Sequence, residues 1–356
     1  MSGRAALPSA LALVLVAACG RVVPHGGESP PAPAPAAATP LPRTFAPAEL
    51  IPSDLDLVVR VDLAKVRSSL GGELPAEGEL PLLDAAGLDA VARQALVHAD
   101  VVWLASRVAD LDEGDRVLAI EGLRGAPDPD ALTRWALHAT GVDGLARYSS
   151  RTKPPRSGTA ELYLLERAGL VLVSPVEAAS VRRIVARGPD AERGQPEARG
   201  LVSLDYRRSA PLPPIFRRFR SLAALLDGIV RVRATVDLRG TVLAVEARVA
   251  CTDARSAGKL AAFLTAFRSA GRADLGVEEL GAEDLERTAA HPAEKANEPA
   301  PHAELLRALT ATANEHIAIV RWDVPRDALA PLFSEARAHA PRPSTRAIRS
   351  DPPQAR

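Results

Sequence analysis

Cysteine, aromatic residues and lysine are all scarce in this chain of 356 residues. The two cysteines, Cys19 and Cys251, allow one disulfide at most, so a disulfide framework is excluded. Aromatic residues make up 3% of the sequence, which disfavours a sugar-binding surface built from exposed aromatic rings. Only four lysines occur and the formal net charge is zero, whereas binding to a phosphate backbone needs a clear basic excess. Nucleic acid is therefore not expected as a partner.

The common catalytic motifs are absent as well. There is no Gly-x-Ser-x-Gly, His-Glu-x-x-His, phosphate-binding loop or dinucleotide-binding glycine pattern. Ser-x-x-Lys occurs at Ser150–Lys153 and Ser256–Lys259, but the first runs into Pro154-Pro155 and neither is accompanied by Ser-Asp-Asn or Lys-Thr-Gly. The sequence therefore predicts no catalytic residues, no cofactor and no enzyme.

No metal site is predicted either. The seven histidines are scattered, and His98 and His138 are expected near helix C-termini, where the partial negative charge favours them. The acidic residues between Asp110 and Asp115 lack the later glutamate of a calcium loop, so we interpret them as a solvated hairpin turn. Cys251 ends a predicted strand and is expected to be a small buried hydrophobic residue.

A hydrophobic run opens the chain. Arg4 precedes the apolar residues 5–16, which are interrupted only by Pro8 and Ser9, and two small residues then lead to Cys19. This layout is typical of a secretory signal, and the run is shorter than the roughly 20 apolar residues that a permanent membrane span needs. We therefore expect residues 1–18 to be a signal peptide.

The end of that run, Val16-Ala17-Ala18-Cys19, resembles the lipobox of bacterial lipoprotein precursors. The resemblance implies that the Cys19 thiol receives a diacylglyceryl group and that its new amine receives a third acyl chain, which would leave no internal disulfide. Two or three chains hold a protein firmly, because each buried methylene contributes about 0.8 kcal/mol. In such lipoproteins an aspartate directly after the cysteine retains the protein in the inner membrane. This chain has Gly20 at that position, which implies the outer membrane. An ordinary cleaved signal followed by a chance cysteine is the alternative.

Two segments of the chain are expected to lack a fold of their own. Residues 19–46 are rich in proline and alanine and favour an extended polyproline II spacer of about 3.1 Å per residue. The basic, proline-rich tail at 339–356 is expected to be disordered. Between them, the non-periodic stretch 188–199 divides the chain into two regions, 47–190 and 198–338.

The first region alternates strand and helix patterns. A strand with period-two alternation is predicted over 55–63, followed by a helix from Leu63 to Leu70 that Asp62 caps. Asp128-Pro129 predicts the start of a helix that Gly141 ends, and Ser174–Glu177 forms a capping-box pattern that opens another helix ending near 188. The remaining expected elements are a helix over 82–98, strands over 101–108 and 116–123, a loop over 148–158 and a hairpin over 160–173.

The second region repeats this order. A strand at 201–206 and a helix at 214–226 precede a clear hairpin, in which a turn at Arg239-Gly240 pairs Leu238 with Thr241. That register places Arg233 opposite Glu246, so the pattern predicts a cross-strand ion pair. A helix over 253–270, a strand over 317–322 and a helix over 325–337 complete the expected elements.

The order strand, helix, strand, strand, helix therefore occurs twice. It predicts an α+β protein of two lobes, each a mainly antiparallel sheet with helices packed on one face. Seven arginines between 207 and 233 and nine acidic residues between 273 and 304 form separate charge blocks. Such blocks either dock on one another, face different partners or are solvated surfaces, and the last is favoured.

The sequence thus favours a non-catalytic lipoprotein, anchored to a membrane through Cys19, whose folded part docks with another envelope protein or with the cell wall. An exposed apolar patch of several hundred Å² outside any pocket is the expected sign of this function. A binding module that holds a small or lipidic ligand between the two lobes is the alternative, and a large apolar pocket there would favour it. An enzyme is the least favoured class.

Overall fold

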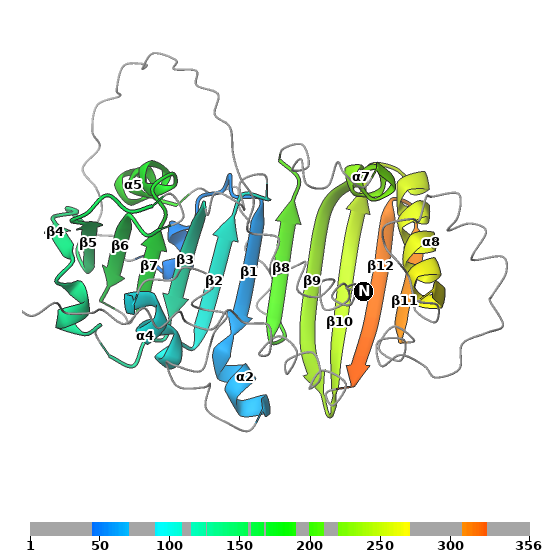
Figure 1. Ribbon diagram of the computed structural model, residues 1–356, viewed down its shortest axis with the longest axis horizontal. Helices are drawn as coiled ribbons and strands as arrows, with labels where there is room; N and C mark the ends of the chain where they lie inside the picture. Colours follow the sequence, from blue (N-terminus) through cyan, green and yellow to red (C-terminus); the bar gives the residue numbers. More distant parts are fainter. Residues whose placement is uncertain are drawn as a thin grey trace, which may run out of the picture.

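A computed structural model describes residues 45–70, 90–108, 115–125, 127–155, 158–166, 169–189, 199–209, 220–270 and 308–325. These residues form one sheet of twelve strands in the order β11-β12-β10-β9-β8-β1-β2-β3-β7-β6-β5-β4 (Figure 1). Every strand pair is antiparallel. The α+β class and the antiparallel pairing are therefore confirmed.

The first half of the body, residues 45–189, supplies seven neighbouring strands. They are β1 (Leu57–Asp62), β2 (Val101–Ser106), β3 (Arg116–Glu121), β4 (Trp135–His138), β5 (Leu145–Ser150), β6 (Glu161–Leu165) and β7 (Gly169–Val173). Its helices are η1 (Pro47–Leu50), α2 (Leu63–Leu70), α4 (Ala90–His98), η3 (Pro129–Leu132) and α5 (Ala178–Arg187). The backbone N–H of Lys65 donates to Asp62 Oδ1 at 2.9 Å, which confirms Asp62 as the cap of α2.

The second half, residues 199–325, supplies the other five strands. They are β8 (Val202–Arg207), β9 (Ile229–Arg239), β10 (Val242–Cys251), β11 (Leu309–Asn314) and β12 (Ile317–Pro325). Its helices are α7 (Arg220–Asp227) and α8 (Ala254–Ala270). Strand β11 was not predicted from the sequence.

The prediction of two lobes is wrong, because β1 pairs with β8 and makes the sheet continuous. Val58 lies opposite Asp205 and Arg60 opposite Ser203 across this junction. Each half taken alone would end in an open strand edge at β1 or β8, with unpaired backbone N–H and C=O groups. Pairing the two edges satisfies those groups, so the halves fuse into one body.

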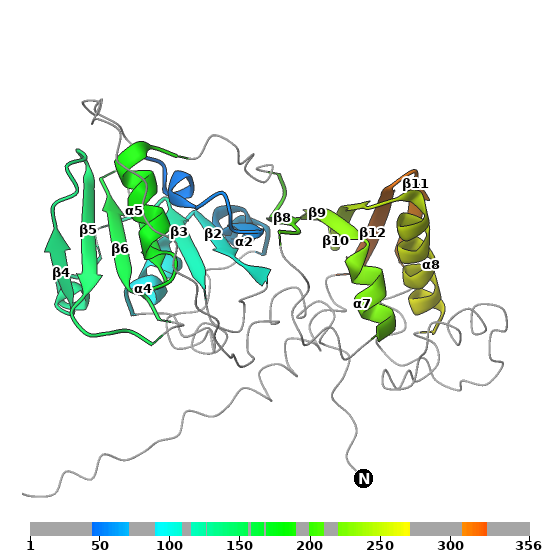
Figure 2. The same cartoon turned by 90° about the horizontal axis from the view of Figure 1, so that it is seen from above.

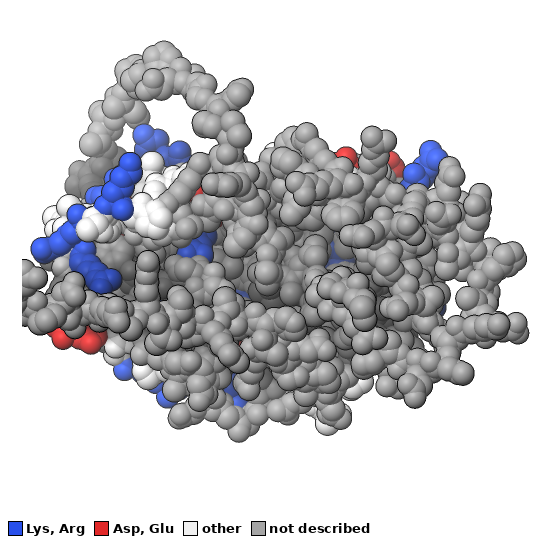
Figure 3. All heavy atoms as spheres, viewed as in Figure 1, with Lys and Arg blue, Asp and Glu red and all other residues white. Residues whose placement is uncertain are grey.

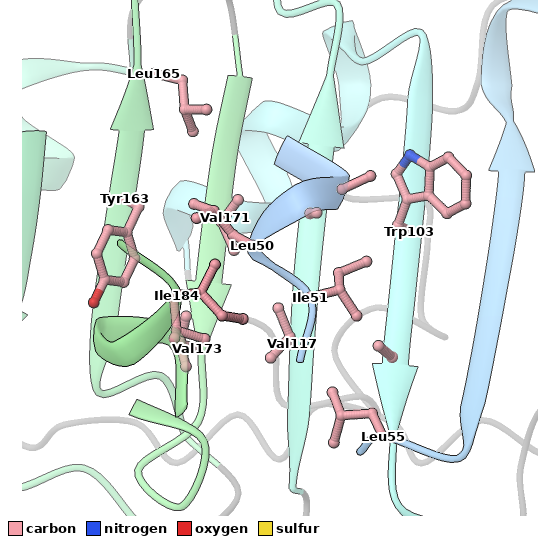
Figure 4. Packing of buried hydrophobic residues seen from close by; sticks show 14 of the residues in the cluster. Leu50, Ile51, Leu55, Trp103, Val117, Tyr163, Leu165, Val171, Val173 and Ile184 are labelled. Carbon is pink, nitrogen blue, oxygen red and sulfur yellow. The ribbon is translucent and has the colours of Figure 1, made fainter. Parts of the chain in front are cut away.

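Helices cover the two sides of the sheet unequally. Figure 2 shows α4, α7 and α8 on one side, which we call the helix side, and η1 on the other. In the first half both sides are covered: α4 packs with Ile120, Leu162 and Leu172, and η1 and α5 pack with Val117, Val171 and Tyr163 (Figure 4). In the second half α7 and α8 pack on the helix side, around Val249 and Ala318. The prediction of helices on one face is therefore wrong for the first half.

The predicted helix from Asp128 to Gly141 is another correction. Asp128 does accept a hydrogen bond from the backbone of Asp130, but the helix is only the short η3, and residues 135–138 form β4. The predicted loop at 148–158 likewise begins inside β5, which pairs with β4 and β6. Tertiary pairing has overridden local helix preference here, because β4 covers the edge of β5 and buries Trp135.

The hairpin of β9 and β10 has a different register from the predicted one. The turn is Gly240-Thr241, with Gly240 in the left-handed region at φ 64°, and Val242 pairs with Arg239. From Arg231 to Arg239 each residue of β9 therefore lies opposite a residue two positions further along than expected, and Arg233 faces Arg248 instead of Glu246. A shift of two residues keeps these side chains on their predicted side, because strand side chains alternate with period two. At the start of β9 the register is irregular, and Val230, which the alternation predicts to face inward, is exposed.

Several predictions lie outside the described residues. They are the signal peptide and the linker, Cys19 and Gly20, most of the acidic turn between Asp110 and Asp115, the acidic block at 273–304, the helix over 325–337 and the tail. The predicted helix over 82–98 is described from Ala90 onward and the helix over 214–226 from Arg220 onward.

Candidate interaction surface

The side of the second half opposite α7 and α8 is not covered by any described element, and we call it the open face. One cross-strand row shows how it relates to the core. Val117, Ala105 and Val58 are successive neighbours in the row and belong to the buried cluster beneath η1. The same row continues through the junction to Asp205, Arg233 and Arg248. The side of the sheet that forms an apolar core in the first half therefore carries arginines in the second.

Three arginines, Arg207, Arg231 and Arg233, lie at one buried carboxylate, and a fourth, Arg248, lies opposite Arg233 on the next strand. We call these four arginines the arginine cluster. Arg231 donates to both oxygens of Asp205, with Nε to Oδ1 at 2.8 Å and Nη2 to Oδ2 at 2.6 Å. Arg207 Nε lies 3.5 Å from Oδ2, a charge contact without hydrogen-bond geometry, and Arg233 Nε lies 4.0 Å from Oδ1. Asp205 is 1% exposed, so a single buried negative charge lies close to three partly exposed arginines.

Arg248 is the member of the cluster without an acidic partner. It lies directly opposite Arg233 and Ile319, is exposed, and has no ion pair with any described residue. Glu246, the nearest acidic residue on its strand, lies opposite Arg321 and contacts Arg239 at 3.4 Å. A favourable pair of directly opposite residues stabilises a sheet by about 0.2–1 kcal/mol, whereas two like charges in such a pair destabilise it. The pairing of Arg233 with Arg248 therefore concentrates positive charge at a small cost in stability.

The remaining predicted basic block has a structural role where it is described. Arg208 Nη2 donates to Asp227 Oδ1 at 2.7 Å and so connects the end of β8 to the end of α7. The space-filling view in Figure 3 shows another gathering of basic side chains near α5, whose exposed arginines are Arg182, Arg183 and Arg187. The arginine cluster is separate from these side chains and lies on a part of the sheet that no described element covers.

Polar side chains also fill the junction between the halves. Arg60 Nη2 donates to Asp62 Oδ2 at 3.1 Å, and its guanidinium lies 5.6 Å from the ring centroid of Trp103. Asp56 accepts from the backbone of Val108 at 2.7 Å and from the Ser209 hydroxyl at 2.9 Å. Burial raises the pKa of Asp56, and these two hydrogen bonds oppose the rise. Asp56 therefore connects the two halves through β2 and the end of β8.

A second buried carboxylate, Glu161, organises the far end of the first half. Its oxygens accept from Arg147 Nη2 at 2.7 Å, Arg182 Nη1 at 3.1 Å and the Tyr163 hydroxyl at 2.6 Å. Burial, followed by the hydrogen bond and the negative charge of Glu161, raises the pKa of Tyr163. These groups come from β5, β6 and α5 and satisfy one another, so the cluster is a structural connection.

Replacing Tyr163 with phenylalanine is expected to lower the free energy of unfolding by about 2 kcal/mol, because a buried hydrogen bond to a charged carboxylate is lost. Urea denaturation followed by circular dichroism measures the change. Tyr148→Phe is the matched control, since Tyr148 on β5 makes no hydrogen bond with a described residue, and it should change the stability by less than about 0.5 kcal/mol. Equal effects of both substitutions would contradict the role of Glu161.

The other residues discussed from the sequence do not assemble into a site. The Ser150 hydroxyl donates to the carbonyl of Thr152 at 2.7 Å, and Ser256 lies within α8 beside Thr252. His98 ends α4 as predicted, whereas His138 lies in β4 and contacts the Ser149 hydroxyl. Cys251 is buried, as predicted, and burial raises the pKa of its thiol. In the described part of the chain, no three histidine, cysteine or acidic residues are grouped to hold a metal ion.

A hollow of about 310 Å³ lies beside α4. Val91, Ala95 and Leu123 form its apolar wall, and His98 and Arg124 contribute polar groups. All of its lining residues belong to the first half, so it lies away from the junction where the alternative function places a ligand. Among the described helices, none is long and apolar enough to span a bilayer.

No protein-family model and no curated protein matches the chain. Solved structures of TP0453 show a distant likeness. Crystal form I has a TM-score of 0.43 and 10% identity over 82% of this chain and 98% of that one. Crystal form III has a TM-score of 0.42 and 11% identity, covering 82% and 99%, and form IV has 0.41 and 12%, covering 80% and 95%. At such TM-scores the likeness carries no argument about function.

Proposed function

We propose that this chain is a non-catalytic lipoprotein of the bacterial cell envelope, anchored by lipidated Cys19, whose folded body docks with another envelope protein or with the cell wall. The anchor places it in the outer membrane, because Gly20 follows the cysteine. The observation that carries the proposal is the N-terminal sequence, in which a basic residue, a short apolar run and Val16-Ala17-Ala18-Cys19 follow one another.

The composition of the body supports binding over chemistry. The buried acidic groups Asp205 and Glu161 are neutralised by arginines that come from neighbouring strands and a helix. They therefore hold the fold together. The expected apolar patch is not seen in the described chain, where the exposed large hydrophobic residues Leu137, Val176 and Val230 lie on separate segments. The open sheet face is polar, which suits contact with an extended surface better than enclosure of a small molecule.

The alternative, a binding module for a small or lipidic ligand, calls for a cavity between the halves. The β1–β8 ladder and the polar side chains of Arg60, Asp62 and Ser203 occupy that junction in the described residues. The hollow beside α4 lies elsewhere and is modest in size, since ligand pockets typically enclose about 300–1,000 Å³. Docking therefore remains the preferred function.

Mass spectrometry of the processed protein from bacterial envelopes tests the anchor directly. The expected N-terminal peptide begins at Cys19 and carries the mass of a diacylglyceryl group, which has two acyl chains, with or without that of a third, amide-linked acyl chain. The peptide that contains Cys251 is the internal control, because it should carry no lipid. An unmodified N-terminus, or a leader still attached to the chain, would remove the basis of the proposal.

A further inference from the structure

We propose that the arginine cluster binds the phosphate headgroups of an anionic membrane and seats the open face on the bilayer that holds the lipid anchor. The inference builds on the proposed function, which brings the chain to a membrane. It adds the surface through which the body meets the lipid, and it leaves the helix side for the partner.

The first argument is the local charge. The cluster combines four guanidinium groups with a single carboxylate, to which three of them are close, so its net charge is +3, and that carboxylate is 1% exposed. Arg233 and Arg248 are exposed and directly opposite each other, where no described acidic residue separates them. A bound anion would reduce the repulsion between these two guanidinium groups.

The second argument is the chemistry of the donors. A guanidinium presents a planar fork of N–H groups that binds phosphate oxygens in pairs, and it is more weakly hydrated than an ammonium. Directly opposite residues in an antiparallel sheet lie about 5 Å apart, which allows neighbouring arginines to share one phosphate or to bind two adjacent ones. An open sheet face therefore meets a layer of headgroups at several points at once.

The third argument is the position of the tether. The described chain begins at residue 45 and enters η1, which packs on the side of the sheet opposite α4. That side is continuous with the open face, as the row through Val58, Asp205 and Arg233 shows. The 25 residues from 20 to 44 would span about 80 Å if extended, whereas twelve strands are about 58 Å wide. The described chain thus begins on the side that carries the cluster, and a linker of this length would allow that side to reach the bilayer.

The far end of the open face limits the footprint. Asp237, Glu246 and Asp323 lie toward the β9–β10 turn, where they balance Arg239 and Arg321. The excess of positive charge is therefore local to the junction. Binding should depend on the four cluster arginines and should weaken at high salt, because exposed charges are screened within about 10 Å at 0.1 M ionic strength.

Vesicle co-sedimentation tests the proposal with the mature chain carrying Cys19→Ser, so that no acyl chain contributes. Vesicles of phosphatidylcholine containing one third phosphatidylglycerol should bind the protein at low ionic strength, and vesicles of phosphatidylcholine alone should not. The double variant Arg233→Gln/Arg248→Gln should bind the anionic vesicles about 30-fold more weakly, since each arginine near such a surface contributes roughly a factor of five.

The matched control is Arg255→Gln/Lys259→Gln, which removes the same charge from exposed positions on α8 on the helix side. It should leave vesicle binding within about twofold, because these residues face away from the bilayer. Thermal melting checks that both variants fold. Equal losses in both variants, or no binding by the parent chain, would overturn the proposal.

The test also separates other occupants of the open face. If the parent chain ignores anionic vesicles but captures an acidic envelope protein in a manner that needs Arg233 and Arg248, the occupant is a protein and the lipid proposal fails. The proposed function would survive that result, because the anchor is read independently from the mass of the N-terminal peptide.

Discussion

Replacing Asp205 with alanine is expected to lower the free energy of unfolding by about 3 kcal/mol. The substitution removes the carboxylate that pairs with Arg231 and draws in Arg207 and Arg233. Breaking a buried ion pair by deleting one partner costs about 3–5 kcal/mol, and the lower end applies because these arginines can turn toward water. The loss should appear as a lower midpoint in urea denaturation, with an unchanged dependence on urea.

The control for this prediction is Asp237→Ala, which removes an exposed carboxylate that lies on β9 on the same side of the sheet as Asp205. This substitution should lower the free energy of unfolding by less than about 0.5 kcal/mol. A stability loss at Asp205 no larger than that of the control would show that the arginines do not depend on it. In that case the cluster would be an ordinary solvated surface, and the argument for an anion site would lose its central feature.

Replacing Cys19 with alanine is expected to move the protein from the membrane fraction to the soluble fraction without unfolding it. The acyl chains on Cys19 are expected to anchor the protein in the bilayer, and each buried methylene contributes about 0.8 kcal/mol. Their loss therefore removes nearly all of the protein's affinity for the membrane. The arginine cluster supplies only a salt-sensitive remainder. Fractionation of cells followed by immunoblotting, with circular dichroism of the released protein, measures both parts of the prediction.

Cys251→Ala is the matched control, since Cys251 is buried at the end of β10 and should leave the protein with the membrane. The Cys19→Ala protein is compared after washing in high salt, which removes electrostatic binding. A variant that has lost its leader and still resists this wash would place the anchor elsewhere in the chain.

The periodicity of the chain predicted most strands and the sides they present. Alternation with period two placed β1, β8, β9 and β10 close to their observed bounds, because the same apolar side must be buried in any pairing. It failed at β4 and β5, where a proline-led helix signal at Asp128 ends after one turn. The pairing of β4 with β5 is a long-range contact that local preference does not record.

The arginine cluster was not predictable as a site. The sequence showed a basic block near Arg207 and Arg233 and an expected ion pair with Glu246, which described a neutral surface. The observed register brings Arg248 opposite Arg233 instead, and the β8–β9 pairing brings Asp205 opposite Arg233 on the other side. The observed register could have been considered from the sequence, since a two-residue turn at Gly240-Thr241 fits the alternation of the two strands as well as one at Arg239-Gly240.

The residues alone settled the α+β class, the antiparallel pairing and the inward-facing sides of the main strands, because burial of apolar side chains depends on spacing along the chain. The tertiary structure decided that the halves share one sheet and which charges meet on its open face. Both depend on which strand edges pair and in what register, and hydrogen bonds between distant backbone segments select these with no mark in the local sequence.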